Sequence, residues 1–181
     1  MPHVSGPQVT VFGVFPPPVT GMTVCTGKIA DRVAETTVVR RLDLSNGSPV
    51  IDWPFRLAKL GRILRAYWCL VVRRKPVAAW LYMPINARAA AHFNLVAALL
   101  GRLRGYRIVA HHHVYAYLDR FDWRIWLLDK LVGSQGAHTV HCPLMQEHFQ
   151  ARYPTDVPFW FVPPTIVSAP RSAEPSRVPG R

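Results

Sequence analysis

Short apolar runs alternate with longer helical patterns along most of this chain, and this alternation limits the possible folds more than any other feature. The strand-like runs are residues 8–15, 37–44, 77–82, 107–113, 138–141 and 159–162. Helical spacing of apolar residues marks the stretches 22–35, 53–75, 88–104, 122–132 and 145–153. Strands that alternate with helices in this way form right-handed βαβ crossovers. The sequence therefore predicts the α/β class, as a single Rossmann-like parallel sheet with helices on both faces.

The length of the chain fits one such domain. It has 181 residues, of which 50% are apolar and 18% are charged, a balance that can fill a hydrophobic core. We expect a flexible N-terminus at residues 1–7 and a folded domain at 8–166. Residues 167–181 are rich in Pro, Ser and Arg and lose the apolar period, so they are predicted to form a disordered tail.

The cysteines and the apolar runs bear on where the protein works. Cys25, Cys69 and Cys142 form no C-x-x-C pair, which argues against a disulfide framework and favours a reducing compartment. Residues 1–7 lack the basic start of a signal peptide. The longest strongly apolar runs are well short of the roughly 20 residues that span a bilayer. We therefore expect a cytoplasmic protein, free or peripherally bound at the inner face of the plasma membrane.

The loop after the first predicted strand is the first candidate site, because ligands of open parallel sheets bind beyond the carboxyl ends of strands. Its sequence from residue 15 is FPPPVTGMT. The glycine lets the backbone approach a ligand, while threonine hydroxyls and the helix N–H groups suit an acceptor or a phosphate. The candidate residues are Pro17, Pro18, Thr20, Gly21 and Thr23. The loop matches neither G-x-G-x-x-G nor a Walker motif, and a stiff loop with a helix cap is the structural alternative.

Three histidines end the strand predicted at residues 107–113 and form the second candidate site. Along a strand, His111 and His113 share one face and His112 points to the other. A histidine that titrates near neutrality acts as a proton donor or binds a hydroxyl or phosphate. A buried core histidine and a solvent-exposed one are the structural alternatives for individual members of the set.

Metal binding by the histidines is not favoured by the sequence. His138, His141, Cys142 and His148 add candidate ligands. Their spacing matches neither H-E-x-x-H nor a Cys/His finger, and His138 and His141 fall on opposite faces of a strand. The sequence therefore predicts no metal site.

Three segments together resemble a known family: VTVFGVFPPPVTGMT near the start, IVAHHHVY in the middle, and AHTVHCPLMQEHFQARYP followed by FVPPTIV at the end. In this order and spacing they are similar to the N-terminal, acceptor-side domain of family 4 retaining glycosyltransferases, over about residues 8–166. The resemblance implies one half of a GT-B fold. It also implies transfer of a sugar from a nucleotide-sugar to a glycan or lipid-linked acceptor, in cell-envelope polysaccharide synthesis.

The resemblance assigns roles to the two candidate sites. The loop at residues 16–23 would face the acceptor and the donor phosphates, and His113 would be the catalytic residue that contacts the transferred sugar, with His111 and His112 beside it. Family members use no metal and no cofactor, since the nucleotide-sugar is a substrate. Where the family has a glycine pair, this chain has Gly21 followed by Met22.

Family members also carry a second Rossmann-like domain, which binds the donor, and the 181 residues contain no counterpart of it. The expected function is thus the acceptor-binding half of a glycosyltransferase, completed by a separate C-terminal domain. The alternatives are a non-catalytic binding or interaction module and an inactive truncated remnant.

The predicted helix at 53–75 has an apolar side and basic flanks. Its apolar residues fall on one face of the helix, at positions 57, 60, 63, 64, 67, 68 and 71. Basic residues beside a tryptophan suit an anionic lipid surface, which makes Trp53, Arg56, Lys59, Arg62 and Arg65 candidate membrane contacts. An ordinary amphipathic helix is the alternative. The formal net charge of +12 also raises nucleic acid as a partner, but the chain shows no nucleic-acid-binding motif and its arginines are spread out.

Overall fold

The computed structural model describes residues 8–45, 53–72 and 79–162. The predicted N-terminal segment 1–7, the tail 167–181 and the predicted helix end at 73–75 lie outside the described residues. So do residues 163–166, at the predicted end of the domain. Within the described residues, no helix combines the length and apolar character that crossing a membrane requires.

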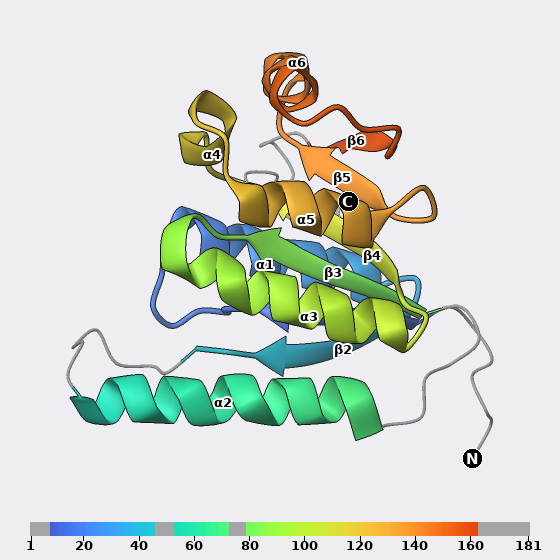
Figure 1. Cartoon of the computed structure of the whole chain (residues 1–181). Helices are drawn as coiled ribbons and strands as arrows, with labels where there is room; N and C mark the ends of the chain where they lie inside the picture. Colours follow the sequence, from blue (N-terminus) through green and yellow to red (C-terminus); the bar gives the residue numbers. More distant parts are fainter. Residues whose placement is uncertain (1–7, 46–52, 73–78, 163–181) are drawn as a thin grey trace, which may run out of the picture.

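Six parallel strands form one sheet in the order β2-β1-β3-β4-β5-β6 (Figure 1). The strands are β1 Gln8–Gly13, β2 Val38–Asp43, β3 Ala79–Ile85, β4 Arg107–His112, β5 Ala137–Val140 and β6 Phe159–Phe161. The chain runs from β1 outward to β2, returns past β1 to β3, and then adds strands on that side. This arrangement confirms the predicted α/β class and the Rossmann-like parallel sheet.

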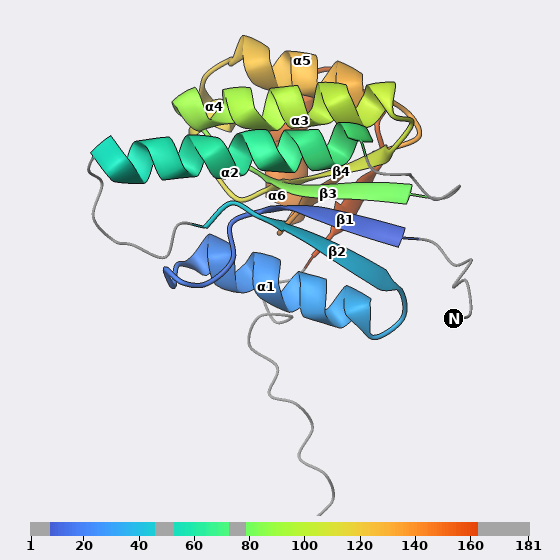
Figure 2. The same ribbon diagram turned by 90° about the horizontal axis from the view of Figure 1, so that it is seen from below.

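Helices cover both faces of the sheet, α1 on one side and α2, α3 and α5 on the other (Figure 2). The helices are α1 Gly21–Ala34, α2 Trp53–Val72, α3 Ala91–Leu103, α4 Ala116–Asp119, α5 Trp123–Val132 and α6 Pro143–Arg152. A 3₁₀ turn, η1 at Arg88–Ala90, precedes α3. The short helix α4 was not predicted.

Two hydrophobic cores follow from this layering. The larger core joins the sheet to α2, α3, α5 and α6 and includes Phe12, Leu70, Leu128 and Phe149. The smaller core lies under α1 and contains Val11, Phe15, Ala30, Tyr82 and Val109. Successive residues of β4 alternate between the two cores, as the two-residue period of a strand requires. The histidines at the end of β4 are divided between the two faces by the same alternation.

The third predicted strand, at 77–82, ends too early, because β3 continues through Pro84 to Ile85; residues 77 and 78 lie outside the described residues. The pairing of β3 with β1 stops at Val11↔Tyr82. Beyond that point β3 has a register partner only in β4, where Pro84 lies opposite His111. A strand with one paired neighbour tolerates a residue without an N–H donor.

The apolar residues that were predicted to share one face of α2 are divided in the structure between a buried stripe and an exposed one. Ile63, Ala66 and Leu70 are buried, and Tyr67 packs against Phe12 with parallel rings. A second apolar stripe on the same helix is exposed, at Trp53, Leu57, Leu60, Leu64, Trp68 and Val71. The sequence predicted a single apolar face because the two stripes lie next to each other around the helix.

Candidate functional site

All six strands end at the same edge of the sheet, and the two candidate loops leave from that edge. Residues 14–20 connect β1 to α1, and His113 directly follows β4. The strand order reverses between β1 and β3, because β1 is followed by β2 on one side and β3 lies on the other. Ligands of open α/β sheets bind outside the carboxyl ends of strands at such a point.

The proline-rich loop is held by a cap on α1. The peptide bonds Pro16–Pro17 and Pro17–Pro18 are cis, and residues 16–21 are exposed. Thr20 is the N-cap: its hydroxyl accepts a hydrogen bond from the Thr23 N–H at 3.2 Å, and Thr23 Oγ1 accepts one from the Thr20 N–H at 2.8 Å. Thr23 Oγ1 also lies 2.8 Å from the carbonyl oxygen of Pro18. Both threonine side chains therefore take part in the helix cap that the sequence raised as the alternative.

Gly21, the first residue of α1, borders open space. A Cβ atom added to it would meet no other atom within 4 Å. No acidic residue occupies the first turn of α1, so the partial positive charge of the helix N-terminus is not opposed locally. Pro17, Pro18 and Gly21 thus line an accessible helix start, where an anionic group has room.

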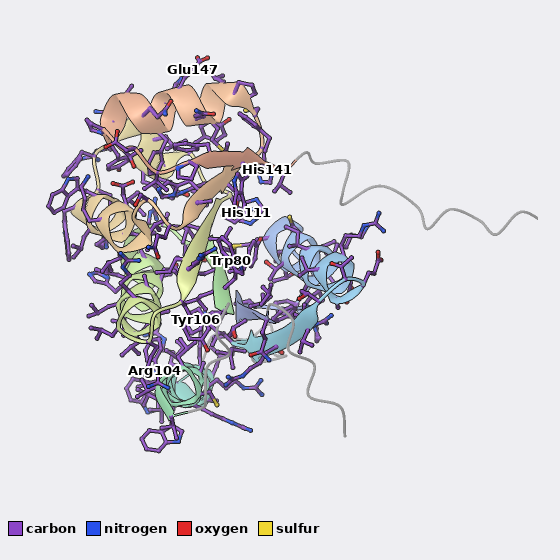
Figure 3. All side chains as sticks on the ribbon, turned by 90° about the vertical axis from the view of Figure 1, so that its right-hand side faces the viewer. Trp80, Arg104, Tyr106, His111, His141 and Glu147 are labelled. Atoms are coloured by element: carbon purple, nitrogen blue, oxygen red, sulfur yellow. The ribbon has the colours of Figure 1, made fainter. Side chains whose placement is uncertain are left out.

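Three histidines gather on the α1 side of the sheet: His111, His113 and His141. The ring centroids of His111 and His113 are 3.9 Å apart, and that of His141 lies 4.9 Å from His111. Figure 3 shows His111 and His141 on the side of the sheet that faces α1. His111 is fully buried, whereas His113 and His141 are half-buried. His141, from the end of β5, was considered in the sequence only as a possible metal ligand.

Hydrogen bonds assign the protons in this cluster. His141 Nδ1 donates to the carbonyl oxygen of Val162 at 3.1 Å, which leaves its Nε2 as the nitrogen that accepts a hydrogen bond. His113 Nδ1 is its donor, at 3.2 Å. His111 Nδ1 is hydrogen-bonded to the hydroxyl of Tyr82. Among the described residues, the Nε2 atoms of His111 and His113 are both buried without a hydrogen-bond partner.

Burial keeps these two imidazoles uncharged. Desolvation, reinforced by the neighbouring His113 and His141, lowers the pKa of His111 to about 2. Desolvation and His141 lower the pKa of His113 to about 4. Both rings are therefore neutral at pH 7, which corrects the expectation of a histidine that titrates near neutrality. A neutral imidazole can accept or donate a hydrogen bond or ligate a metal.

His112 lies on the opposite face of β4, as its position in the strand predicted, and belongs to a different network. Its Nε2–H donates to His138 Nδ1 at 2.9 Å, and its Nδ1 accepts from the Tyr117 hydroxyl at 2.9 Å. His138 Nε2–H donates in turn to the Asp129 carboxylate at 3.1 Å. Both ring nitrogens of the buried His112 are thus hydrogen-bonded, and His112 lies on the opposite face of the sheet from His111 and His113.

The pKa values in this second network keep both histidines neutral and the carboxylate charged. Desolvation, followed by the proximity of His138, puts the pKa of His112 well below its usual value. Desolvation also lowers the pKa of His138, although Asp129 opposes the shift. Burial alone would raise the pKa of Asp129, but its hydrogen bonds, that from His138 foremost, hold it below the usual value. This fully paired chain joins α5 to β4 and β5.

Cys25 is the site residue that sequence reasoning missed. It lies on the buried side of α1, 4% exposed, and burial raises the pKa of its thiol. Its Sγ and one ring nitrogen each of His111 and His113 lie within 4.8 Å of one another. The only sequence signal was its position, five residues after Thr20 in the helix that follows the proline-rich loop.

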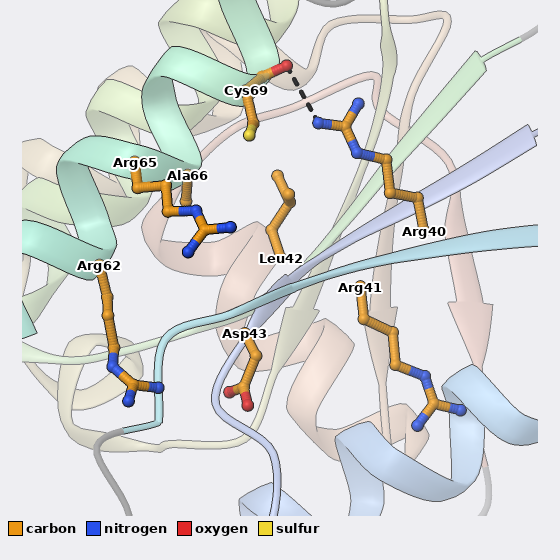
Figure 4. A pocket seen from close by; sticks show the side chains of 8 residues that line it. All are labelled: Arg40, Arg41, Leu42, Asp43, Arg62, Arg65, Ala66 and Cys69. Atoms are coloured by element: carbon orange, nitrogen blue, oxygen red, sulfur yellow. Dashed lines mark hydrogen bonds between the residues drawn. The ribbon is translucent and has the colours of Figure 1, made fainter.

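A basic pocket lies between β2 and α2, away from the histidines (Figure 4). Its volume is about 470 Å³, and its lining comprises Arg40, Arg41, Leu42, Asp43, Arg62, Arg65, Ala66 and Cys69. Arg40 donates to the backbone oxygen of Cys69 at 3.1 Å, and Arg62 donates to that of Ser45. The contributions of Arg40 and Arg41 were not predicted, because nothing in the sequence places β2 beside α2.

The predicted membrane contacts are spread over more than one side of α2. Trp53, Arg56, Arg62 and Arg65 are exposed and Lys59 is half-buried. Trp53 belongs to the exposed apolar stripe, in which Leu64 is 56% and Trp68 is 67% exposed. Arg62 and Arg65 also line the basic pocket towards β2. Exposed apolar side chains that recur at helical spacing beside cationic ones are typical of a helix that lies on a membrane or a partner.

No protein-family model matches this chain, and no match is found among the curated proteins or the solved structures. The assignment comes from the six parallel strands, the reversal of strand order between β1 and β3, and the helices on both faces. On these grounds the chain is an α/β domain with a Rossmann-like fold.

Proposed function

We propose that this chain is the acceptor-binding half of a retaining glycosyltransferase of the GT-B type. The proposal depends on one observation. An accessible proline-rich loop, before α1, and a histidine cluster, at the ends of β4 and β5, lie at the same edge of the Rossmann-like sheet. Because many activities share this fold, the proposal depends on these side chains and on the resemblance of the segments that carry them.

The chemistry of retaining sugar transfer suits these groups. The donor loses a nucleoside diphosphate, whose negative charge is stabilised by a helix N-terminus. The start of α1 offers such a terminus, with open space at Gly21. His113 Nε2 has no partner among the described residues but is buried, so accepting a hydrogen bond from a sugar hydroxyl requires a movement of the half-buried ring that exposes this nitrogen. In this proposal His113 contacts the transferred sugar, with His111 beside it, and the loop positions the acceptor.

A lipid-linked acceptor is the substrate class that the surface of α2 favours. The exposed apolar stripe and two arginines of the neighbouring pocket, Arg62 and Arg65, lie on the same helix. An anionic membrane attracts each basic residue near its surface by about 1 kcal/mol, and the apolar stripe adds the energy of burial. A domain held at the cytoplasmic membrane surface would meet a lipid-linked acceptor there. Exposed apolar side chains between the arginines favour lipid over nucleic acid as the anionic partner.

A non-catalytic membrane-binding module is the second candidate function, favoured by the same stripe on α2. Membrane docking by α2 requires none of the groups at the carboxyl edge of the sheet, so docking alone would explain that helix. A truncated, inactive remnant of a glycosyltransferase also keeps this surface. The two candidates differ in whether a donor-binding domain completes the site.

Association with a second domain tests the proposal. The chain is expressed, with an affinity tag, together with a Rossmann-like domain that carries a glutamate pair and is encoded beside it. We expect the two products to co-purify in a 1:1 ratio and to bind a nucleotide-sugar. An unrelated Rossmann-like domain serves as the control. Failure of every adjacent candidate to associate would favour the non-catalytic module.

A further inference from the structure

We infer that Cys25, His111 and His113 form a binding site for a zinc-type divalent metal ion, with one sulfur and two imidazole ligands. The sugar transfer proposed above needs no metal, and a bound metal ion would occupy the same His113 Nε2 that the sugar contact uses, so this site goes beyond that proposal as an alternative state of the same histidine. The sequence alone predicted no metal site. The ligands that it added to the histidines at the end of β4 were His138, His141, Cys142 and His148, and Cys25 was not among them.

The three ligand atoms are already gathered. Cys25 Sγ and one ring nitrogen of each histidine lie within 4.8 Å of one another, from three places on α1, β4 and the residue after β4. In a tetrahedral zinc site, with bonds of about 2.0–2.3 Å, neighbouring ligand atoms are about 3.4–3.6 Å apart. Shifts of about 1 Å would therefore bring this group to bonding geometry.

The hydrogen bonds around the site leave one ring nitrogen of each histidine free. His113 Nδ1 is bound to His141, which is bound in turn to the carbonyl oxygen of Val162. His111 Nδ1 is bound to the Tyr82 hydroxyl. Metal-ligating histidines typically use their second nitrogen in such bonds, which fix the ring and its tautomer. The Nε2 atoms that remain are both buried and unpartnered, and coordination would satisfy each of them.

The chemistry of the ligands selects the class of ion. Thiolate and imidazole suit zinc, while magnesium, calcium and manganese prefer carboxylate and carbonyl oxygens. Both imidazoles are neutral, the form that binds a metal. On binding, the S–H bond of Cys25 breaks, a sulfur–metal bond forms and the proton passes to solvent. Three protein ligands leave a fourth position for water or for a substrate oxygen.

The second histidine network offers no comparable site. His112 and His138 bond to each other, and their remaining nitrogens bond to Tyr117 and Asp129. A metal ion there would have to break two or more buried hydrogen bonds. The described residues contain no other group of three His, Cys, Asp or Glu side chains within this range.

The test is metal titration of the isolated full chain after treatment with a chelator. We expect calorimetry to show one Zn²⁺ per chain, with proton release. Co²⁺ in the same site should give the intense near-ultraviolet charge-transfer band of a thiolate–cobalt bond. The Cys25→Ser variant should lose this band and bind Zn²⁺ at least ~100-fold more weakly, since even outer hydrogen-bond partners of metal ligands contribute about 10–100-fold.

Matched variants separate this site from surface binding. Cys142→Ser and His148→Ala alter a cysteine and a histidine outside the cluster and should leave affinity unchanged. His141→Gln, which disturbs the support of His113, should weaken binding by about 10–100-fold. Circular dichroism checks that each variant folds. Absence of stoichiometric binding, or wild-type Co²⁺ spectra without a thiolate band, would overturn the site. Neither result bears on co-purification with a donor domain, which is measured without metal.

Discussion

Lowering the pH from 7 to 5 is expected to destabilise the folded domain by about 3–4 kcal/mol through His111 and His113, whose folded-state pKa values are about 2 and about 4. The buried His112 and His138 also have a lowered folded-state pKa and add a loss of the same sign. Below pH 6.5 the unfolded chain therefore binds protons that the folded chain does not, and stability falls with pH. Each such histidine costs about 1.4 kcal/mol per pH unit until its folded-state pKa is reached.

The size of this effect is large beside the stability of a typical domain, about 5–15 kcal/mol. Asp129 adds a loss of the same sign at lower pH, because its folded-state pKa is depressed and its stabilisation disappears as the carboxylate is protonated. Urea unfolding at pH 7, 6 and 5 in a chelating buffer measures the profile. His148→Ala, on the exposed side of α6, should leave it unchanged. A free energy of unfolding that stays constant from pH 7 to 5 would contradict the burial of these histidines.

Replacing two apolar residues on the outer side of α2 is expected to weaken binding to anionic vesicles by about 30- to 1,000-fold. The double variant is Leu64→Ser with Trp68→Ser, both exposed in the free domain. Full burial of a large apolar side chain contributes about 1.5–3 kcal/mol. Because the membrane interface buries each of these two side chains only in part, each should contribute about 1–2 kcal/mol to binding. Their exposure also means that folding should survive the change.

Charge should contribute less per residue than the apolar stripe. Arg56→Gln with Arg65→Gln removes two charges worth about 1 kcal/mol each, which lowers affinity by about 30-fold in low salt and less in high salt. Vesicle sedimentation with and without anionic lipid measures both effects. Leu144→Ser, an equally exposed site on α6, is the control and should bind like the wild type. Equal binding of the wild type to neutral and anionic vesicles would contradict the electrostatic contribution.

The sequence predicted the sheet because local signals agree with the fold. Asp122 caps α5 with its side chain, and Gly105 takes a positive φ of 72° after α3, as a glycine at a helix end should. The alternation of apolar residues in β4 correctly separated His112 from His111 and His113. These features depend on neighbours in the chain, which a sequence displays directly.

Features that depend on distant contacts were missed. The sequence could not show that β3 extends past Pro84, since this depends on where β1 stops pairing. It could not separate the two apolar stripes of α2, because only the packed structure decides which one faces the sheet. Cys25 and His111 are far apart in the chain and meet only because α1 packs under β4. The free nitrogens of the cluster likewise follow from Tyr82, His141 and Val162, which come from other strands and loops.

Sugar transfer is the most direct test of the proposed function. The chain is mixed with the donor domain that co-purifies with it, labelled nucleotide-sugars and a lipid extract, and incorporation into lipid is counted in the presence of a chelator. We expect transfer only when both domains are present. His113→Ala should lower kcat by about 100-fold or more, the loss typical for one transition-state contact, while His148→Ala retains full activity. Full transfer by the donor domain alone, or by the pair with His113→Ala, would contradict the assignment of this chain as the acceptor-binding half.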